Sequence, residues 1–116
     1  MDQATLDGFR RRLTDEHKAI VHQLTEMGID PQSGAPDNTE FEHGFADSGQ
    51  ATAEKARVLS IAEGLVEQLH EVETALGRIE QGTFGRCENC GKEIPVDRLD
   101  ARPVARLCLD CKKRLG

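Results

Sequence analysis

The stretch that decides the fold runs from Cys87 to Cys111 and reads CENCGKEIPVDRLDARPVARLCLDC. It holds two Cys-x-x-Cys pairs separated by seventeen residues, a spacing typical of zinc sites. The four cysteines are Cys87, Cys90, Cys108 and Cys111. Two residues between paired cysteines let one tight turn present both thiolates to the same ion, and Gly91 relieves the steric limit on the first turn. Four thiolates leave no open coordination position, so the stretch predicts one structural zinc ion.

A redox Cys-x-x-Cys pair and an iron–sulfur cluster are the alternative interpretations of these cysteines. Two matched pairs at this spacing favour zinc over both. The N-terminal residues Met1, Asp2 and Gln3 lack the basic-then-apolar order of a signal peptide, and no stretch approaches the roughly eighteen apolar residues of a membrane span. We therefore expect a cytoplasmic protein that makes no membrane contact and whose thiols stay reduced.

Upstream of the cysteines, apolar residues recur at alternating steps of four and three, which is the heptad pattern of a coiled-coil helix. They are Val58, Ala62, Leu65, Leu69, Val72, Leu76 and Ile79. With its approach from about Gly49, this helix is expected to run some thirty residues, or about 45 Å at 1.5 Å per residue. Gly82 follows it, as helix C-termini prefer.

A second apolar stripe lies between Gln3 and Met27 and predicts another long helix. Its members are Leu6, Phe9, Leu13, Ile20, Leu24 and Met27. Residues 28–38 collect Gly, Pro, Ser and Asn, so the first helix is expected to end there.

Two helices of similar length, each with one apolar stripe, most simply fold back on each other. We therefore predict a mainly α fold with two parts. The first is a long antiparallel two-helix coiled-coil hairpin over residues 1–82, with its tip around residues 29–50. The second is a small four-cysteine zinc-finger module over residues 83–116, with a short C-terminal helix.

Charge is unevenly distributed along the 116 residues, whose net charge is −6. Residues 83–116 hold eight basic and five acidic side chains, a net charge of +3, which leaves −9 for residues 1–82. This balance is a poor match for bare nucleic acid, so we expect no direct sequence-specific DNA binding. The sequence also holds no nucleophile elbow, phosphate loop or open metal site, and we therefore expect that the protein is not an enzyme.

The zinc-ligand stretch and the predicted hairpin together resemble the DksA/TraR family. The likeness is carried by residues 82–91 (GTFGRCENCG), 93–99 (EIPVDRL) and 108–111 (CLDC). Residues 44–50 (GFADSGQ) resemble the short, actinobacterial-type members most. The resemblance covers most of residues 41–116 and is architectural in the first helix.

The resemblance implies a transcription regulator that binds bacterial RNA polymerase through its secondary channel, the route by which nucleotides enter. In this family the coiled-coil tip approaches the active site and changes the stability of open promoter complexes at initiation. The better-known members act together with the alarmone ppGpp. The expected partners are therefore RNA polymerase and, at the polymerase interface, ppGpp, and we expect the protein itself to be a monomer.

Asp47 matches an acidic tip position of the family, so the resemblance implies that it contacts polymerase near the active site. The alternative interpretation is an N-cap of the second helix, because Asp accepts backbone N–H bonds at helix starts. Both roles can hold at once. Glu40 and Glu42 lie close enough in sequence to add charge at the tip, although solvated loop acids are the simpler interpretation of these two.

Two other functions compete with polymerase binding. One is a coiled-coil adaptor or oligomerising protein that carries a structural zinc finger. The other is a zinc-ribbon DNA-binding module, which would place Arg98, Arg102, Arg106 and residues 112–114 on phosphates. The four histidines have no ligand partner at a useful spacing apart from a loose pair at 17 and 22, and we interpret all of them as surface or seam residues. They are His17, His22, His43 and His70.

Overall fold

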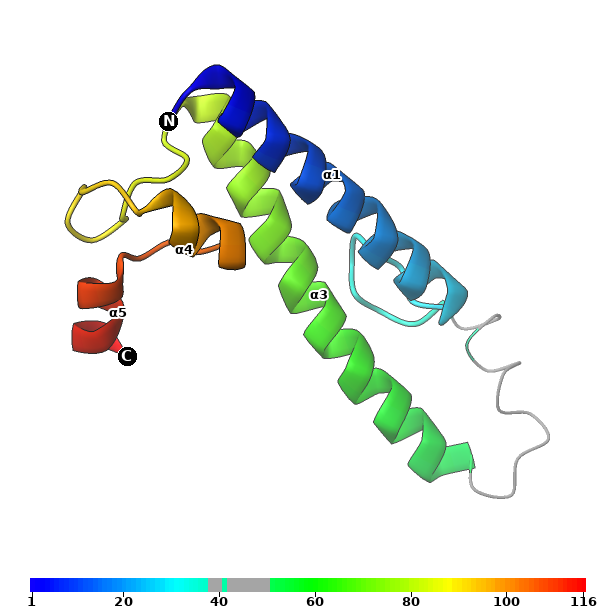
Figure 1. Ribbon diagram of the computed structural model, residues 1–116. Coiled ribbons are helices and arrows are strands. Elements are labelled where there is room, and N and C mark those ends of the chain that lie inside the picture. The colour runs from blue at the N-terminus through cyan, green and yellow to red at the C-terminus, as the bar shows by residue number, and fades with distance from the viewer. Residues whose placement is uncertain (38–40, 42–50) are drawn as a thin grey trace. The chain divides into compact units, whose positions relative to one another are not determined.

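The computed structural model describes residues 1–37, 41 and 51–116 and is mainly α-helical (Figure 1). Its helices are α1 (Gln3–Glu26), α3 (Ala51–Gln81), α4 (Val96–Ala101) and α5 (Leu109–Leu115). Two isolated β-bridges, and no strand, occur within the described residues. The described residues group into two compact units, Met1–Asp15 with Glu71–Gly116 and Glu16–His70. None of the helices in these ranges is long and apolar enough to cross a membrane.

The predicted mainly α fold with a pair of long helices is confirmed. The α1 helix has 24 residues and the α3 helix has 31, so α3 is about 46 Å long at 1.5 Å per residue. The short C-terminal helix is also present as α5. The predicted division of the chain at Gly82 stays a prediction.

The start of α1 is capped by Asp2, whose Oδ1 accepts the backbone N–H of Thr5 at 2.8 Å. This bond satisfies one of the donors that a helix leaves free in its first turn. Hydrogen bonds from the side chain and backbone of Thr5 lower the pKa of Asp2 below its usual 3.8. The capping hydrogen bonds therefore favour the charged form of the Asp2 carboxylate.

Both long helices end in the same glycine motif. At the end of α1, Gly28 has φ 76° and the N–H of Ile29 donates to the carbonyl of Leu24 at 2.9 Å. At the end of α3, Gly82 has φ 76° and the N–H of Thr83 reaches back five residues in the same way, to the carbonyl at position 78, at 2.9 Å. A left-handed residue with this bond satisfies the last carbonyls of a helix, which explains a glycine at each end.

In the unit Glu16–His70, the second half of α1 packs on the first part of α3. The buried side chains are Ile20 and Leu24 from α1 and Ala62 and Leu69 from α3. The loop after α1 adds Ile29, which pairs with Pro36 in an antiparallel bridge. Gly34 lies so close to α3 that a Cβ there would be 3.4 Å from Val66. The loop thus contributes Ile29 to this small core and places Gly34 against α3.

In the other unit, the start of α1 packs on the end of α3, so the two helices run antiparallel here. Phe9 and Leu13 of α1 are buried in this unit, as are Val72, Ala75 and Ile79 of α3. Ala75 is buried although it was not in the predicted seam, whereas Leu76 is half-buried. A straight helix with 3.6 residues per turn drifts from a strict heptad repeat, which brings the neighbour of a seam position inward.

Candidate metal centre

Four cysteine sulfurs converge at one point of the unit that contains residues 71–116. The side chains of Cys87, Cys90, Cys108 and Cys111 place their Sγ atoms within 4.8 Å of one another. The Sγ atoms of Cys90 and Cys108 are 3.8 Å apart. A tetrahedron of thiolates at the usual Zn–S distance of about 2.3 Å has S–S edges of about 3.8 Å. The arrangement therefore fits a zinc ion bound by four thiolates.

The first cysteine pair lies on a tight turn between the two sides of a β-bridge. Arg86 pairs with Glu93 in this bridge, and the N–H of Cys87 donates to the carbonyl of Lys92 at 2.8 Å. Gly91, with φ 75°, donates to the carbonyl of Cys87 at 3.0 Å. The backbone is left-handed at Gly91, a conformation that glycine adopts without steric cost. This agrees with the role that the sequence predicted for Gly91.

The second pair lies at the start of α5. Cys108 is the N-cap residue of this helix, and its carbonyl accepts the N–H of Lys112 at 2.9 Å. Cys111 follows one turn later and is fully buried. The two pairs are joined through the backbone, because the N–H of Glu88 donates to the carbonyl of Arg106 at 2.9 Å.

The two buried thiols have opposite pKa shifts. The backbone N–H of Cys108 is the largest of several hydrogen-bond donors that lower the pKa of Cys87 to about 6. The amide of Asn89 donates to the Sγ of Cys111 at 3.3 Å and lowers its pKa, but burial and the three neighbouring thiols raise it to about 11. A bound cation would favour the thiolate form at every one of these sulfurs.

The metal centre is part of a hydrophobic cluster that reaches α1. Its buried members are Phe9, Cys87, Ile94, Leu99, Ala105 and Cys111. Phe84 packs against this cluster, with its ring centroid 5.5 Å from that of Phe9. The cysteine segment is too short to bury a core of its own, and it completes one by packing on the two long helices.

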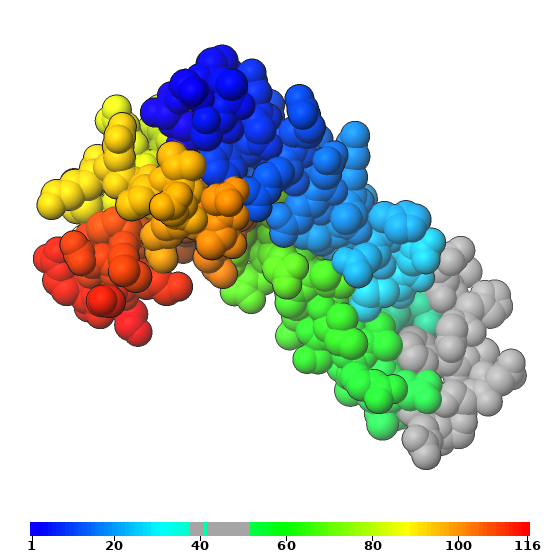
Figure 2. Space-filling model, viewed as in Figure 1, coloured from blue at the N-terminus to red at the C-terminus, as the bar shows by residue number. Residues whose placement is uncertain are grey.

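Ion pairs between exposed side chains connect the cysteine segment to the long helices. Arg12 of α1 donates to the carboxylate of Asp100 at 2.8 Å and to its carbonyl at 3.0 Å, and it lies over the ring of Phe9. Figure 2 shows the part of the chain around α4, in orange, beside the start of the chain, in blue. Arg102, just after α4, donates to Glu71 of α3 at 3.3 Å. Exposed pairs of this kind contribute at most about 1 kcal/mol each, so they orient the segment more than they stabilise it.

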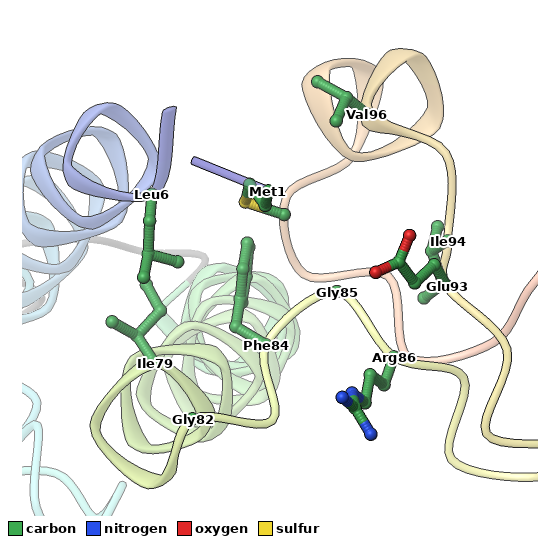
Figure 3. Close-up of a pocket in the computed structure, with 10 residues that line it drawn as sticks. All are labelled: Met1, Leu6, Ile79, Gly82, Phe84, Gly85, Arg86, Glu93, Ile94 and Val96. Carbon is green, nitrogen blue, oxygen red and sulfur yellow. The ribbon is translucent and has the colours of Figure 1, made fainter. Parts of the chain in front are cut away.

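A cleft of about 250 Å³ lies beside the metal centre, where the start of α1 meets the end of α3 (Figure 3). Leu6, Ile79 and Phe84 form its apolar wall. Met1 lies between Leu6 and Gly85 in this view. Gly85, with φ 84°, forms part of the lining, and a Cβ there would be 2.9 Å from the Met1 side chain. The positive φ at this position is the feature that favours glycine there.

The other sequence candidates lie apart from this centre or outside the described residues. Asp47, Glu40, Glu42 and His43 fall in the ranges that the structure does not describe. His22 pairs with Glu26 at 3.2 Å, and among the described residues the four cysteines are the one group of three or more such side chains that could hold a metal. Sequence reasoning missed Asn89, although its position between the first two cysteines could have indicated a contact with a metal ligand.

The described geometry agrees with comparisons to known proteins. The family model of the prokaryotic dksA/traR C4-type zinc finger matches residues 82–115, which include all four cysteines. The RNA polymerase-binding transcription factor DksA of Haemophilus influenzae is 30% identical over 117 residues, covering 97% of this chain and 74% of the relative. The chain belongs to the DksA/TraR family. Its four cysteines accordingly form a C4-type zinc finger that is suited to one structural zinc ion.

Other DksA proteins support the same relationship over nearly the whole chain. The RNA polymerase-binding transcription factor DksA of Escherichia coli K12 is 33% identical over 110 residues, and the chain spans 64% of its length. The solved structure of the transcription factor DksA2 from Pseudomonas aeruginosa matches with a TM-score of 0.78 at 25% identity, covering 98% of this chain and 84% of the other. The likeness therefore includes the helices as well as the zinc finger.

Proposed function

We propose that this chain is a transcription regulator that binds bacterial RNA polymerase through the secondary channel and changes the stability of open promoter complexes at initiation. The observation that carries the proposal is the alignment with the polymerase-binding DksA of H. influenzae, which spans 97% of this chain. A relationship confined to the zinc finger would support a shared metal site only. The alignment with the H. influenzae protein extends over both long helices.

Physical features of the chain suit the proposed role. The α3 helix, at about 46 Å, is long enough to span a channel through a large enzyme. The net charge of −9 on residues 1–82 suits a basic path that admits anionic nucleotides. Opposite charges of this kind speed association and select the correct partner more than they tighten binding.

The zinc finger and the coiled-coil hairpin have different roles in this proposal. Cys87, Cys90, Cys108 and Cys111 hold one zinc ion, which supplies no chemistry and keeps the finger folded. Asp47 contacts polymerase near its active site, and ppGpp acts at the polymerase interface. The protein functions as a monomer in the cytoplasm, without direct contact to specific DNA sequences and without enzymatic activity.

The adaptor alternative would need a second apolar stripe for another helix. Among the described residues of α3, Ile61 is the one large apolar side chain that is exposed, and a single residue does not form such a stripe. Light scattering of the zinc-loaded protein tests this alternative directly. A monomer supports the polymerase proposal, and a stable dimer supports the adaptor.

Binding to polymerase can be measured and located in one experiment. A photoreactive amino acid is introduced at position 47 and, as a matched control, at exposed position 70 of α3, and each variant is irradiated with bacterial RNA polymerase. The proposal predicts crosslinks from position 47 to the polymerase segments that surround the active site, and none of these from position 70. Absence of saturable polymerase binding by the unmodified chain would contradict the proposal.

A further inference from the structure

Arg78 connects the end of α3 to the segment that leads into the first zinc ligand. Its side chain is only 11% exposed, although it carries a charge. The Nη2 atom donates to the carbonyl oxygen of Thr83 at 3.0 Å and also to the carbonyl oxygen of Arg86. Both acceptors lie between the C-terminal glycine of α3 and Cys87. One guanidinium therefore spans the whole junction.

The carbonyl of Arg86 needs a donor from outside its own bridge. Arg86 lies opposite Glu93, but the hydrogen bonds of this antiparallel bridge are made by the flanking residues. Cys87 donates to Lys92 at 2.8 Å and Ile94 donates to Gly85 at 2.7 Å. In such a pair the intervening carbonyl points away from the partner strand. Arg78 supplies the donor at this place.

Glu88 extends the same contact to both cysteine pairs. It lies between Cys87 and Cys90 in sequence, and one carboxylate oxygen is 3.9 Å from the Nη1 of Arg78. The other oxygen is 3.9 Å from the Nη1 of Arg106, which precedes Cys108 by two residues. A chain of charges thus runs from α3 over the first pair to the segment before the second pair.

We propose that Arg78 is a positioning residue, which fixes the direction in which the zinc finger leaves α3, and that Glu88 couples this contact to zinc occupancy. The fork of a guanidinium suits this task because it can bind two carbonyls and a carboxylate at fixed angles. When zinc is bound, both cysteine pairs are held and Glu88 is fixed beside Arg78. When zinc is lost, the turn that carries Glu88 loses two of its anchors and the junction opens more often.

The consequence for polymerase binding rests on the proposed function. A partner that contacts both α3 and the finger binds more tightly when these are already held in one arrangement, because less entropy is lost on association. Arg78→Met should therefore weaken polymerase binding on the order of tenfold, as expected for the loss of charge-assisted hydrogen bonds that fix the junction. It does so without removing any group that contacts the zinc.

The test compares Arg78→Met with Arg86→Met in the full zinc-loaded chain. Arg86 is a matched control because its side chain is exposed, it lies in the same segment, and its backbone carbonyl is unchanged by the substitution. Amide hydrogen exchange at Thr83 and Arg86 reports on opening of the junction. Arg78→Met should speed this exchange about tenfold and Arg86→Met less than twofold. Exchange in Arg78→Met within twofold of wild type would overturn the proposal.

Two additional measurements separate positioning from general damage to the fold. Cobalt is substituted for zinc, and its absorption bands report on the four-thiolate geometry, which Arg78→Met should leave unchanged. Loss of these bands would show that Arg78 supports the metal site itself and would overturn the positioning role. Should Arg78→Met fail to fold, Arg78→Lys keeps the charge but lacks the fork, and its exchange should still exceed that of wild type. Equal exchange in Arg78→Lys and wild type would then overturn the proposal.

Polymerase affinity is measured on the same variants. If wild type does not bind polymerase, the proposed function fails, and the exchange data still decide whether Arg78 fixes the junction. If wild type binds and Arg78→Met binds equally well despite faster exchange, the link between the junction and polymerase binding is overturned. Weaker binding by Arg78→Met together with unchanged binding by Arg86→Met supports it.

Discussion

The ring of Phe9, in the second turn of α1, lies 5.5 Å from the ring of Phe84, at an angle of 49° between their planes. Phe84 lies in the segment between α3 and the first zinc ligand, so this contact links the start of the chain to the zinc finger. Tilted aromatic pairs at this distance are favourable beyond the area that they bury. Phe9 is also buried in the cluster that contains Cys87 and Cys111.

Truncation of the Phe9 side chain should therefore loosen the packing of the zinc finger on α1. We expect Phe9→Ala to lower the free energy of unfolding by about 3–4 kcal/mol, the usual cost of removing a buried phenyl ring. Leu115→Ala is the control, because Leu115 is 64% exposed and its loss should change stability by less than about 0.5 kcal/mol. Urea unfolding of the zinc-loaded proteins measures both. Similar losses in the two variants would contradict the role of Phe9.

Removal of one zinc ligand should affect the two parts of the chain differently. We expect Cys108→Ser to bind zinc much more weakly and to loosen residues 83–116, because the metal holds a segment that is too short to fold alone. Much of the helicity of α1 and α3 should remain. Zinc content and circular dichroism, compared with chelator-treated wild type, measure these effects. Unchanged melting with full zinc content would refute the assignment of this ligand.

Two glycines of the same helix region should respond in opposite ways to alanine. Gly64→Ala should raise the free energy of unfolding by about 0.5–1 kcal/mol, because Gly64 lies inside α3 with nothing within 4 Å of the added methyl group. Gly82→Ala should lower it by about 1–2 kcal/mol, although space is also available, because φ is 76° at this position. The midpoint of thermal unfolding should therefore rise in Gly64→Ala and fall in Gly82→Ala. Equal effects would show that the left-handed conformation of Gly82 is not required.

The cap of α1 should make the start of this helix sensitive to acid. The pKa of Asp2 is lowered in the folded protein, so its contribution to stability is present above the usual value of 3.8 and is lost as the pH falls through the folded pKa. Asp2→Asn keeps a capping oxygen without a titrating group and should lose less stability than wild type as the pH falls below 3.8. A carboxyl titration by NMR gives the pKa directly. A value at or above 3.8 would contradict the capping role.

The metal centre was the most predictable part of the molecule. Cysteine spacing alone indicated four thiolates on two tight turns, and the structure brings these four sulfurs together. Gly91 was predicted for the same reason and has a positive φ. Such features are local in sequence, since each depends on a few neighbouring residues and on the geometry of one ion.

Contacts between distant residues could not be predicted in the same way. Nothing in a one-dimensional pattern pairs Arg12 with Asp100 or Arg78 with the carbonyl of Arg86, because both depend on the packing of separate segments. Burial of Ala75 in place of Leu76 depends on the local rotation of α3 about its axis. The cap at Asp2 has a local sequence signal, because an Asp stands just before the first residue of the helix.

The proposed function requires that this chain acts on RNA polymerase through the tip of its predicted coiled coil. The most direct test is the lifetime of an open promoter complex formed by bacterial RNA polymerase, measured without the protein, with wild type, and with Asp47→Asn. We expect wild type to shorten the lifetime, and we expect Asp47→Asn to bind polymerase with similar affinity but to leave the lifetime near that of polymerase alone. An unchanged lifetime with saturating wild type would rule out the proposed mechanism.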